Sequence, residues 1–187
     1  MRKVKVQNVD FGKGMPKIAI PLTGERLPAL YEELEYVRAL PADLLEWRAD
    51  YYLGNLLEVP SLLRENVGEK PLLCTVRTRK EGGQAALTPE EYEAAVTALI
   101  GTGKFDLVDL ELSCGQERLL RLLRLCGAAK VLLAGADGYK AGTAAYADAG
   151  LHTHTGRGAA YNAQMAGAIR AAGLPVAFIT PSEYERA

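Results

Sequence analysis

Residues 44–50 read LLEWRAD, and this stretch indicates both the fold and the place of a site. In a β-strand successive side chains alternate between two faces, so Glu46, Arg48 and Asp50 share one face and the residues between them take the other. A strand that is covered on both sides in a parallel sheet reads as an almost continuous apolar run. Charge confined to one face, toward the carboxyl end, is therefore typical of a strand that ends at a polar site.

Two later segments repeat this layout. Residues 72–77 read LLCTVR and carry no charge until Arg77. Residues 105–112 read FDLVDLEL and place Asp109 and Glu111 on one face. Because helix-like stretches separate the three segments, we expect their charged ends to meet at one edge of a parallel sheet.

The composition is that of a soluble globular protein. The 187 residues are 49% hydrophobic and 24% charged, with a formal net charge of −1. This balance gives no reason to expect nucleic acid or a membrane as a partner, and no apolar run approaches the roughly 18 residues of a spanning helix. The N-terminus lacks the apolar core of a signal peptide. We expect a single domain over residues 1–187.

The cysteines and the histidines indicate whether the chain binds a metal and in which cellular compartment it works. Cys74, Cys114 and Cys126 are odd in number and show no metal-ligand spacing, and a reducing cytoplasm is the simplest setting for them. His152 and His154 form a His-x-His pair without an identifiable third ligand, so two surface histidines are the favoured interpretation. We therefore predict no metal and no cofactor.

Strand and helix alternate along the chain. Residues 4–9 alternate and residues 12–14 (GKG) break the alternation, which predicts a short antiparallel N-terminal β-hairpin. The later patterns predict strands at 17–22, 44–50, 72–77, 105–112, 130–133 and 174–180, and helices at 28–40, 56–66, 88–101, 116–125 and 159–172. This alternation is typical of parallel βαβ construction, for which a (β/α)8 barrel and an open doubly wound sheet are the two candidates.

Two observations favour the barrel. No Gly-x-Gly-x-x-Gly turn follows the first strand, which weakens a dinucleotide-binding interpretation. Strands that end in functional side chains suit a barrel, whose sites lie at the carboxyl-end rim. Since a full barrel typically needs about 250 residues, we predict an incomplete α/β barrel of the TIM type, with about six of eight βα units. Unpaired strand edges in such a barrel predict a homo-oligomer.

Charged residues are expected to converge at this rim: Glu46, Arg48, Arg77, Glu81, Asp109 and Glu111. Guanidinium groups offer forked donors and carboxylates accept from hydroxyls, so the set suits a small polyhydroxylated anion. An internal salt-bridge network would use the same residue types, and both interpretations stay open at this point.

Four motifs carry a resemblance to a known family: GKGMPKI at 12–18, EWRAD at 46–50, RTRKEGG at 77–83 and DLEL at 109–112. Their order and spacing resemble type I 3-dehydroquinate dehydratase, a lyase of the shikimate pathway of aromatic amino acid biosynthesis. The match covers about residues 4–133 and leaves 134–187 as a divergent tail.

The resemblance implies a TIM barrel that converts 3-dehydroquinate to 3-dehydroshikimate and water, and we expect a cytoplasmic homodimer. A lysine forms a Schiff base with the substrate ketone, and the imine acts as an electron sink while a histidine moves protons. By motif, Glu46, Arg48 and Arg77 are implied to bind the substrate. Glu81 is implied to be a catalytic residue that orients the histidine.

The tail departs from the family pattern. Ala136 stands at the histidine position, Val176 stands at the lysine position, and the family's last two strands have no counterpart. Activity is therefore predicted to be weak or absent. Lys140, just beyond the fifth strand, is a weaker candidate for an imine-forming amine, and residues 155–158 are a weak anion-binding turn.

Three functions follow. The chain is a dehydroquinate dehydratase with an incomplete site, or a non-catalytic homologue that acts as a small-anion binding or oligomerisation module. The third is a different enzyme that uses His152 and His154 with a metal.

Overall fold

The computed structural model describes residues 4–11, 15–127, 131–133 and 157–178. The chain divides into two compact units, one of residues Lys3–Cys114 and the other of Gly115–Ala187 with Met1–Arg2. A single domain over residues 1–187 stays a prediction. In the described residues, no helix has the length and apolar character needed to cross a membrane.

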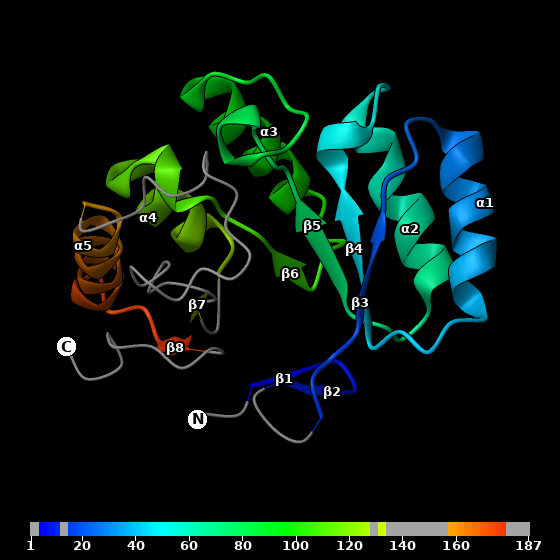
Figure 1. Ribbon diagram of the computed structural model, residues 1–187, viewed down its shortest axis with the longest axis horizontal. Helices are drawn as coiled ribbons and strands as arrows, with labels where there is room; N and C mark the ends of the chain where they lie inside the picture. The colour runs from blue at the N-terminus through cyan, green and yellow to red at the C-terminus, as the bar shows by residue number, and fades with distance from the viewer. Residues whose placement is uncertain (1–3, 12–14, 128–130, 134–156, 179–187) are drawn as a thin grey trace, which may run out of the picture. The chain divides into compact units, whose positions relative to one another are not determined.

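The first unit is built on a four-stranded parallel sheet (Figure 1). The predicted hairpin comes first, with β1 (Val4–Val6) antiparallel to β2 (Val9–Phe11). The sheet follows in the order β3 (Ala19–Leu22), β4 (Leu44–Arg48), β5 (Leu72–Thr75) and β6 (Leu107–Val108). Its helices are α1 (Leu27–Arg38), α2 (Val59–Val67) and α3 (Pro89–Gly101), with 3-10 turns at Ala49–Tyr51, Leu56–Glu58, Arg79–Glu81 and Leu112–Cys114.

The second unit contains two helices and a parallel strand pair. Its elements are α4 (Gln116–Leu125), β7 (Val131–Leu133), α5 (Arg157–Ala171) and β8 (Val176–Phe178). Val131 pairs with Val176 in the ladder between β7 and β8. All six predicted parallel strands therefore have a counterpart, four in one unit and two in the other.

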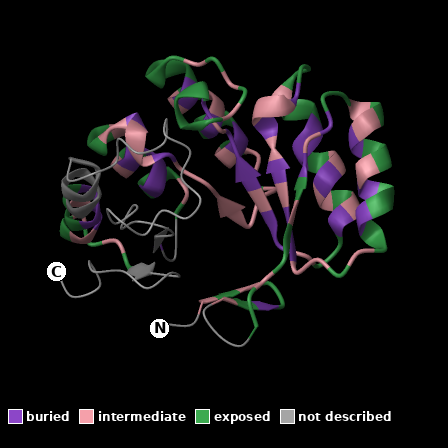
Figure 2. Cartoon of the chain, viewed as in Figure 1, coloured by how far each residue is buried: buried purple, intermediate pink, exposed green. Residues whose placement is uncertain are grey.

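The alternation predicted for residues 44–50 is present in β4, but the strand ends at Arg48 and residues Ala49–Tyr51 form a 3-10 turn. Leu45 and Trp47 are 2% and 0% exposed, whereas Glu46 and Arg48 on the opposite face are half-buried. Trp47 stacks on Phe105, with ring centroids 5.9 Å apart and planes 7° from parallel. Figure 2 shows buried residues along the strands of this sheet. Apolar burial on one face thus fixes which face carries the charges.

Helix α3 begins where its sequence predicts. The Thr88 hydroxyl accepts a bond from the Glu91 backbone N–H at 3.2 Å, and the Glu91 carboxylate accepts from the Thr88 N–H at 2.8 Å. This capping box satisfies two amide donors that the first turn leaves without helical partners, and Pro89 fits that turn because it needs no donor.

The fourth strand is shorter than predicted. Residues 105–112 give a two-residue ladder, Leu107–Val108, followed by the 3-10 turn Leu112–Cys114. The Asp106 carboxylate accepts a hydrogen bond from the Leu72 backbone N–H at 2.9 Å. A side chain therefore accepts from an N–H of β5 that a backbone carbonyl would accept from in a longer ladder. Alternating apolar residues indicated a longer strand because the pattern does not reveal such side-chain competition.

Asp106 joins three segments of the first unit. One carboxylate oxygen accepts from Gln7 Nε2 in the hairpin turn at 2.6 Å, and the other accepts from Arg64 Nη1 of α2 at 2.6 Å as well as from Leu72. Burial alone would raise the pKa of Asp106, but the bonds from Gln7, Leu72 and Arg64 hold this pKa below its usual value. The ionised carboxylate therefore stabilises the fold.

We expect Asp106→Asn to lower the free energy of unfolding at pH 7 by about 2 kcal/mol, because an amide cannot accept all three donors. The contribution of Asp106 is present above the ordinary carboxyl pKa and is lost as pH falls through its lowered value in the folded state. Urea unfolding measured from pH 7 to pH 3 checks both points. Asp10→Asn is the control, because Asp10 lies at an exposed position of the N-terminal hairpin that contains Gln7. An equal loss of unfolding free energy in both variants would contradict the role of Asp106.

Candidate active site

Arg77, two residues beyond the end of β5, is the centre of a charged cluster at the carboxyl ends of the parallel strands. Its Nη1 lies 2.9 Å from Glu81 Oε2 and 3.8 Å from Glu111 Oε1, and its Nη2 lies 2.7 Å from Asp109 Oδ2. One guanidinium thus contacts carboxylates from its own loop and from the segment after β6. The structure brings these four predicted rim residues together.

Glu46 and Arg48 reach the same end of the sheet from β4. Thr75 of β5 donates its hydroxyl to Glu46 Oε1 at 2.6 Å, across the register that pairs Arg48 with Thr75. The Arg48 guanidinium lies 4.9 Å from the centroid of the Tyr51 ring and is held by the neighbouring carboxylate of Asp50. Arg48 is therefore close to the cluster but is not ion-paired with its members.

The electrostatics of the cluster are dominated by burial of its carboxylates. Burial raises the pKa of Asp109, and the nearby Arg77 only partly offsets this effect. Burial also raises the pKa of Glu111, against two bonds from Thr78 that favour the ionised form. Burial would lower the pKa of Arg77, but the three carboxylates raise it above its usual value. Arg77 therefore offsets part of the effect of burial on the pKa values of Asp109 and Glu111.

Glu111 also fixes the loop that carries Arg77 and Glu81. It is 3% exposed, and its carboxylate accepts from the Thr78 backbone N–H at 2.7 Å and from the Thr78 hydroxyl at 2.8 Å. The Tyr92 hydroxyl of α3 accepts the Glu111 backbone N–H at 3.0 Å. Sequence reasoning placed Glu111 at the rim without assigning this role, because its partners come from two other segments of the chain.

The loop itself closes through its own backbone. The Arg79 N–H donates to the Ala85 carbonyl at 2.9 Å, and the Ala85 N–H donates to the Arg77 carbonyl at 3.2 Å. A Cβ on Gly83 would lie 2.1 Å from the Arg77 carbonyl oxygen, so only glycine fits this close approach. The Gly82-Gly83 pair in the sequence is the signal that a tight turn follows Glu81.

Several predicted site residues lie outside the described residues, namely Ala136, Lys140, His152, His154 and residues 155–156. Arg157 and Gly158 begin α5, and Val176 begins β8, all in the second unit. Across the residues with described side chains, no group of three or more His, Cys, Asp or Glu residues is arranged to hold a metal ion.

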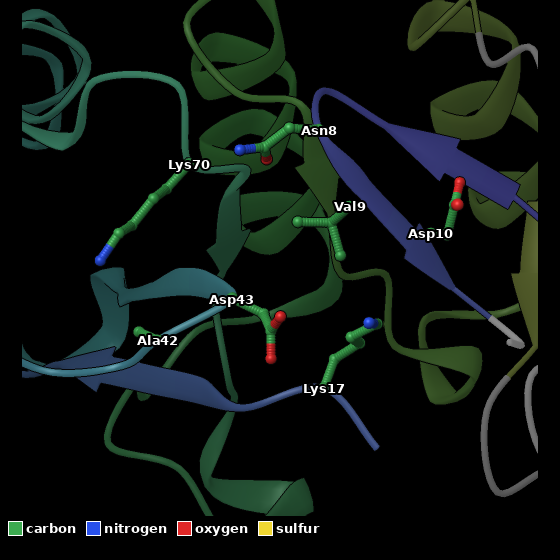
Figure 3. Close-up of a pocket in the computed structure, with 7 residues that line it drawn as sticks. All are labelled: Asn8, Val9, Asp10, Lys17, Ala42, Asp43 and Lys70. Atoms are coloured by element: carbon green, nitrogen blue, oxygen red, sulfur yellow. The ribbon is translucent and has the colours of Figure 1, made fainter. Parts of the chain in front are cut away.

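A hollow of about 310 Å³ lies at the opposite end of the sheet, beside the N-terminal hairpin (Figure 3). It is lined by residues that precede β3, β4 and β5 and by the hairpin: Asn8, Val9, Asp10, Lys17, Ala42, Asp43 and Lys70. One Asp43 oxygen accepts the Ile18 backbone N–H at 2.8 Å. The hollow is therefore distinct from the charged cluster at the carboxyl ends.

Parallel strands that alternate with helices, with charged side chains gathered at the carboxyl ends, occur in TIM barrels and in open doubly wound sheets, and family membership distinguishes the two. The sequence profile of the family described as Type I 3-dehydroquinase matches residues 18–166, and the chain belongs to this family. Its fold is an incomplete α/β barrel, as predicted.

Curated relatives and solved structures agree with this assignment. The 3-dehydroquinate dehydratase of Listeria innocua is 42% identical over 128 residues, which are 66% of this chain and 51% of that protein. The enzyme of Syntrophotalea carbinolica is 45% identical over 117 residues, 60% of this chain and 46% of that protein. The chain thus spans about half the length of the curated relatives it matches.

Two solved structures give the same result. The type I 3-dehydroquinate dehydratase of Clostridium difficile, solved with covalently modified comenic acid, has a TM-score of 0.66 at 31% identity and covers 71% of this chain and 55% of that one. The 3-dehydroquinate dehydratase of Enterococcus faecalis has a TM-score of 0.64 at 35% identity and covers 70% of this chain and 57% of that one.

Proposed function

We propose that the chain binds 3-dehydroquinate, or a closely related small polyhydroxylated acid, at the rim formed by Glu46, Arg48, Arg77 and Glu81. The observation that carries this proposal is the Arg77 cluster, which places one guanidinium among three carboxylates at the carboxyl ends of parallel strands. Carboxylates accept from ring hydroxyls, and the forked donors of Arg48 and Arg77 suit the oxygens of the ligand. Membership of a lyase family supports the substrate class.

The family reaction is the elimination of water from this ligand, and we propose that this chain performs it weakly or not at all. Ala136 and Val176 stand where the resemblance places the proton-shuttling histidine and the Schiff-base lysine. Glu81 is proposed as the carboxylate that would orient such a histidine. Without that imidazole, Glu81 remains bound to Arg77 at 2.9 Å and holds the guanidinium in place.

A non-catalytic binding or oligomerisation module is the second candidate. Support comes from the edges of the four-stranded sheet: in the described part of the first unit, no strand pairs with the outer side of β3 or of β6. Ile18, beside the β3 edge, is 51% exposed. Unpaired edges favour association with another chain, so we propose a homo-oligomer such as a homodimer. In the described residues Cys74, Cys114 and Cys126 form no disulfide, which supports a cytoplasmic setting.

Titration calorimetry of the full chain with 3-dehydroquinate tests the binding proposal. We expect saturable binding that is lost in Arg77→Met and kept in Arg38→Met. Arg38 forms a surface ion pair with Glu35 and is far more exposed, so its substitution controls for the removal of one arginine. Absence of binding by the unmodified chain, or equal binding by both variants, would show that the rim is a structural salt-bridge network.

A further inference from the structure

The Asp50 carboxylate is the most enclosed charge near the rim. It lies in the 3-10 turn Ala49–Tyr51 directly after β4, and its side chain is 0% exposed. Its Oδ1 accepts from Arg48 Nε at 2.8 Å, and its Oδ2 accepts from Arg48 Nη2 at 2.8 Å. This bidentate pair sets both the position and the plane of the Arg48 guanidinium.

The same carboxylate reaches a second segment. Asp50 Oδ2 also accepts the backbone N–H of Gln84 at 3.0 Å, 34 residues further along the chain. Gln84 lies on the returning limb of the loop that carries Arg77 and Glu81. Asp50 therefore links the guanidinium on β4 to the loop that presents the Arg77 cluster.

We infer that Asp50 is a positioning residue: its buried carboxylate holds Arg48 and the 77–85 loop in one arrangement, so that Arg48, Arg77 and Glu81 meet a ligand together. Glu111 holds the first limb of this loop through Thr78, and Asp50 holds the second limb through Gln84. The loop is thus fixed from both neighbouring strands. The role in ligand affinity rests on the proposed function, whereas the link between the two segments does not.

The partners of Asp50 show why a carboxylate is needed here. Arg48 Nε, Arg48 Nη2 and the Gln84 N–H are all donors, and an ionised carboxylate offers acceptors to all of them. An asparagine of the same shape would turn an NH2 group toward at least one donor. Asp50→Asn is therefore a change of chemistry without a change of volume.

Asp50 is not placed to exchange protons with a ligand. Burial would raise the pKa of Asp50, but the bonds from Arg48 and Gln84 lower this pKa below its usual value. Its side chain is not exposed to solvent, and each of its two oxygens already accepts a hydrogen bond, one from Arg48 Nε and the other from the Gln84 N–H. Its effect on a ligand must therefore pass through Arg48 and the loop.

The test compares Asp50→Asn with Asp106→Asn in the full chain. Asp106 is a well-matched control because it also binds an arginine guanidinium and a backbone N–H, those of Arg64 and Leu72, away from the rim. We would measure amide hydrogen exchange of Gln84, the 3-dehydroquinate dissociation constant and the unfolding midpoint. Both variants weaken bonds from one guanidinium and from one backbone N–H, so a difference in Gln84 exchange between them reports where the carboxylate lies and not a general loss of stability.

In Asp50→Asn we expect the Gln84 amide to exchange about tenfold faster or more, and the affinity for 3-dehydroquinate to fall about 10- to 100-fold. In Asp106→Asn we expect the midpoint to fall while Gln84 exchange and affinity stay within about twofold. Equal changes of Gln84 exchange in both variants would overturn the inference.

Two further outcomes separate the inference from the proposed function. If the unmodified chain binds no 3-dehydroquinate, the proposed function fails, while Gln84 exchange still decides whether Asp50 holds the loop. If Asp50→Asn does not fold, the exchange rate of the Gln84 amide in the unmodified chain tests whether Asp50 holds the loop. A Gln84 amide that exchanges there at the rate of an unstructured peptide would overturn the link.

Discussion

The unmodified chain is expected to produce 3-dehydroshikimate from 3-dehydroquinate far below a normal enzymatic rate. An imine with a lysine is the electron sink that makes the neighbouring C–H acidic, and the motif resemblance implies that Val176 takes the lysine position. The same resemblance implies that Ala136 takes the histidine position, and a lost acid–base group alone typically costs ~10²–10⁴-fold in rate. The enone absorbance of the product measures this directly.

Borohydride trapping gives the experiment a second readout. Borohydride reduces an imine to a stable amine, so we expect no covalent adduct between the unmodified chain and 3-dehydroquinate. Turnover at a normal rate by the unmodified chain would mean that another amine serves, and Lys140→Ala would then identify it.

Replacement of Arg77 by methionine is expected to have the largest effect on stability among the rim residues. Arg77 lies within 4 Å of Glu81, Asp109 and Glu111, and its removal leaves three carboxylates without their shared cation. Because the Arg77 side chain is 27% exposed, water screens part of this repulsion, and we expect a loss of about 2 kcal/mol near pH 8. Urea unfolding measures this loss.

The loss should shrink as the pH falls. The pKa values of Asp109 and Glu111 are already raised by burial, and the absence of Arg77 raises them further. In the variant, protonation of these carboxylates in the folded state therefore begins at higher pH and relieves the repulsion. Arg38→Met is the control, since an exposed ion pair contributes little. A loss in Arg77→Met that is the same at pH 8 and pH 5 would contradict this account.

The rim was predictable from sequence because strand alternation and apolar burial are local properties. Burial of Trp47 puts Glu46 and Arg48 on the opposite face, and chain direction brings Arg77 and Asp109 to the same end. The roles of Asp50 and Glu111 were not predictable, since their partners Gln84 and Thr78 lie more than 30 residues away in sequence. No periodic pattern encodes such a pairing.

The length of the fourth strand was missed for a related reason. Apolar alternation over residues 105–112 continues beyond Val108, but the Asp106 carboxylate and the 3-10 turn at Leu112–Cys114 limit the ladder. Helix α3 was predicted well because its start depends on the capping box of Thr88 and Glu91, which lies within four residues.

Trp47 gives this protein a built-in optical probe of one of its two units. It is the sole tryptophan of the chain, it lies in the unit Lys3–Cys114, and it is 0% exposed against Phe105. Its emission should be blue-shifted in the folded state and should move to longer wavelength only when the first unit opens. Circular dichroism at 222 nm reports the helices of both units, so a denaturation curve that differs between the two signals would show that the units unfold separately.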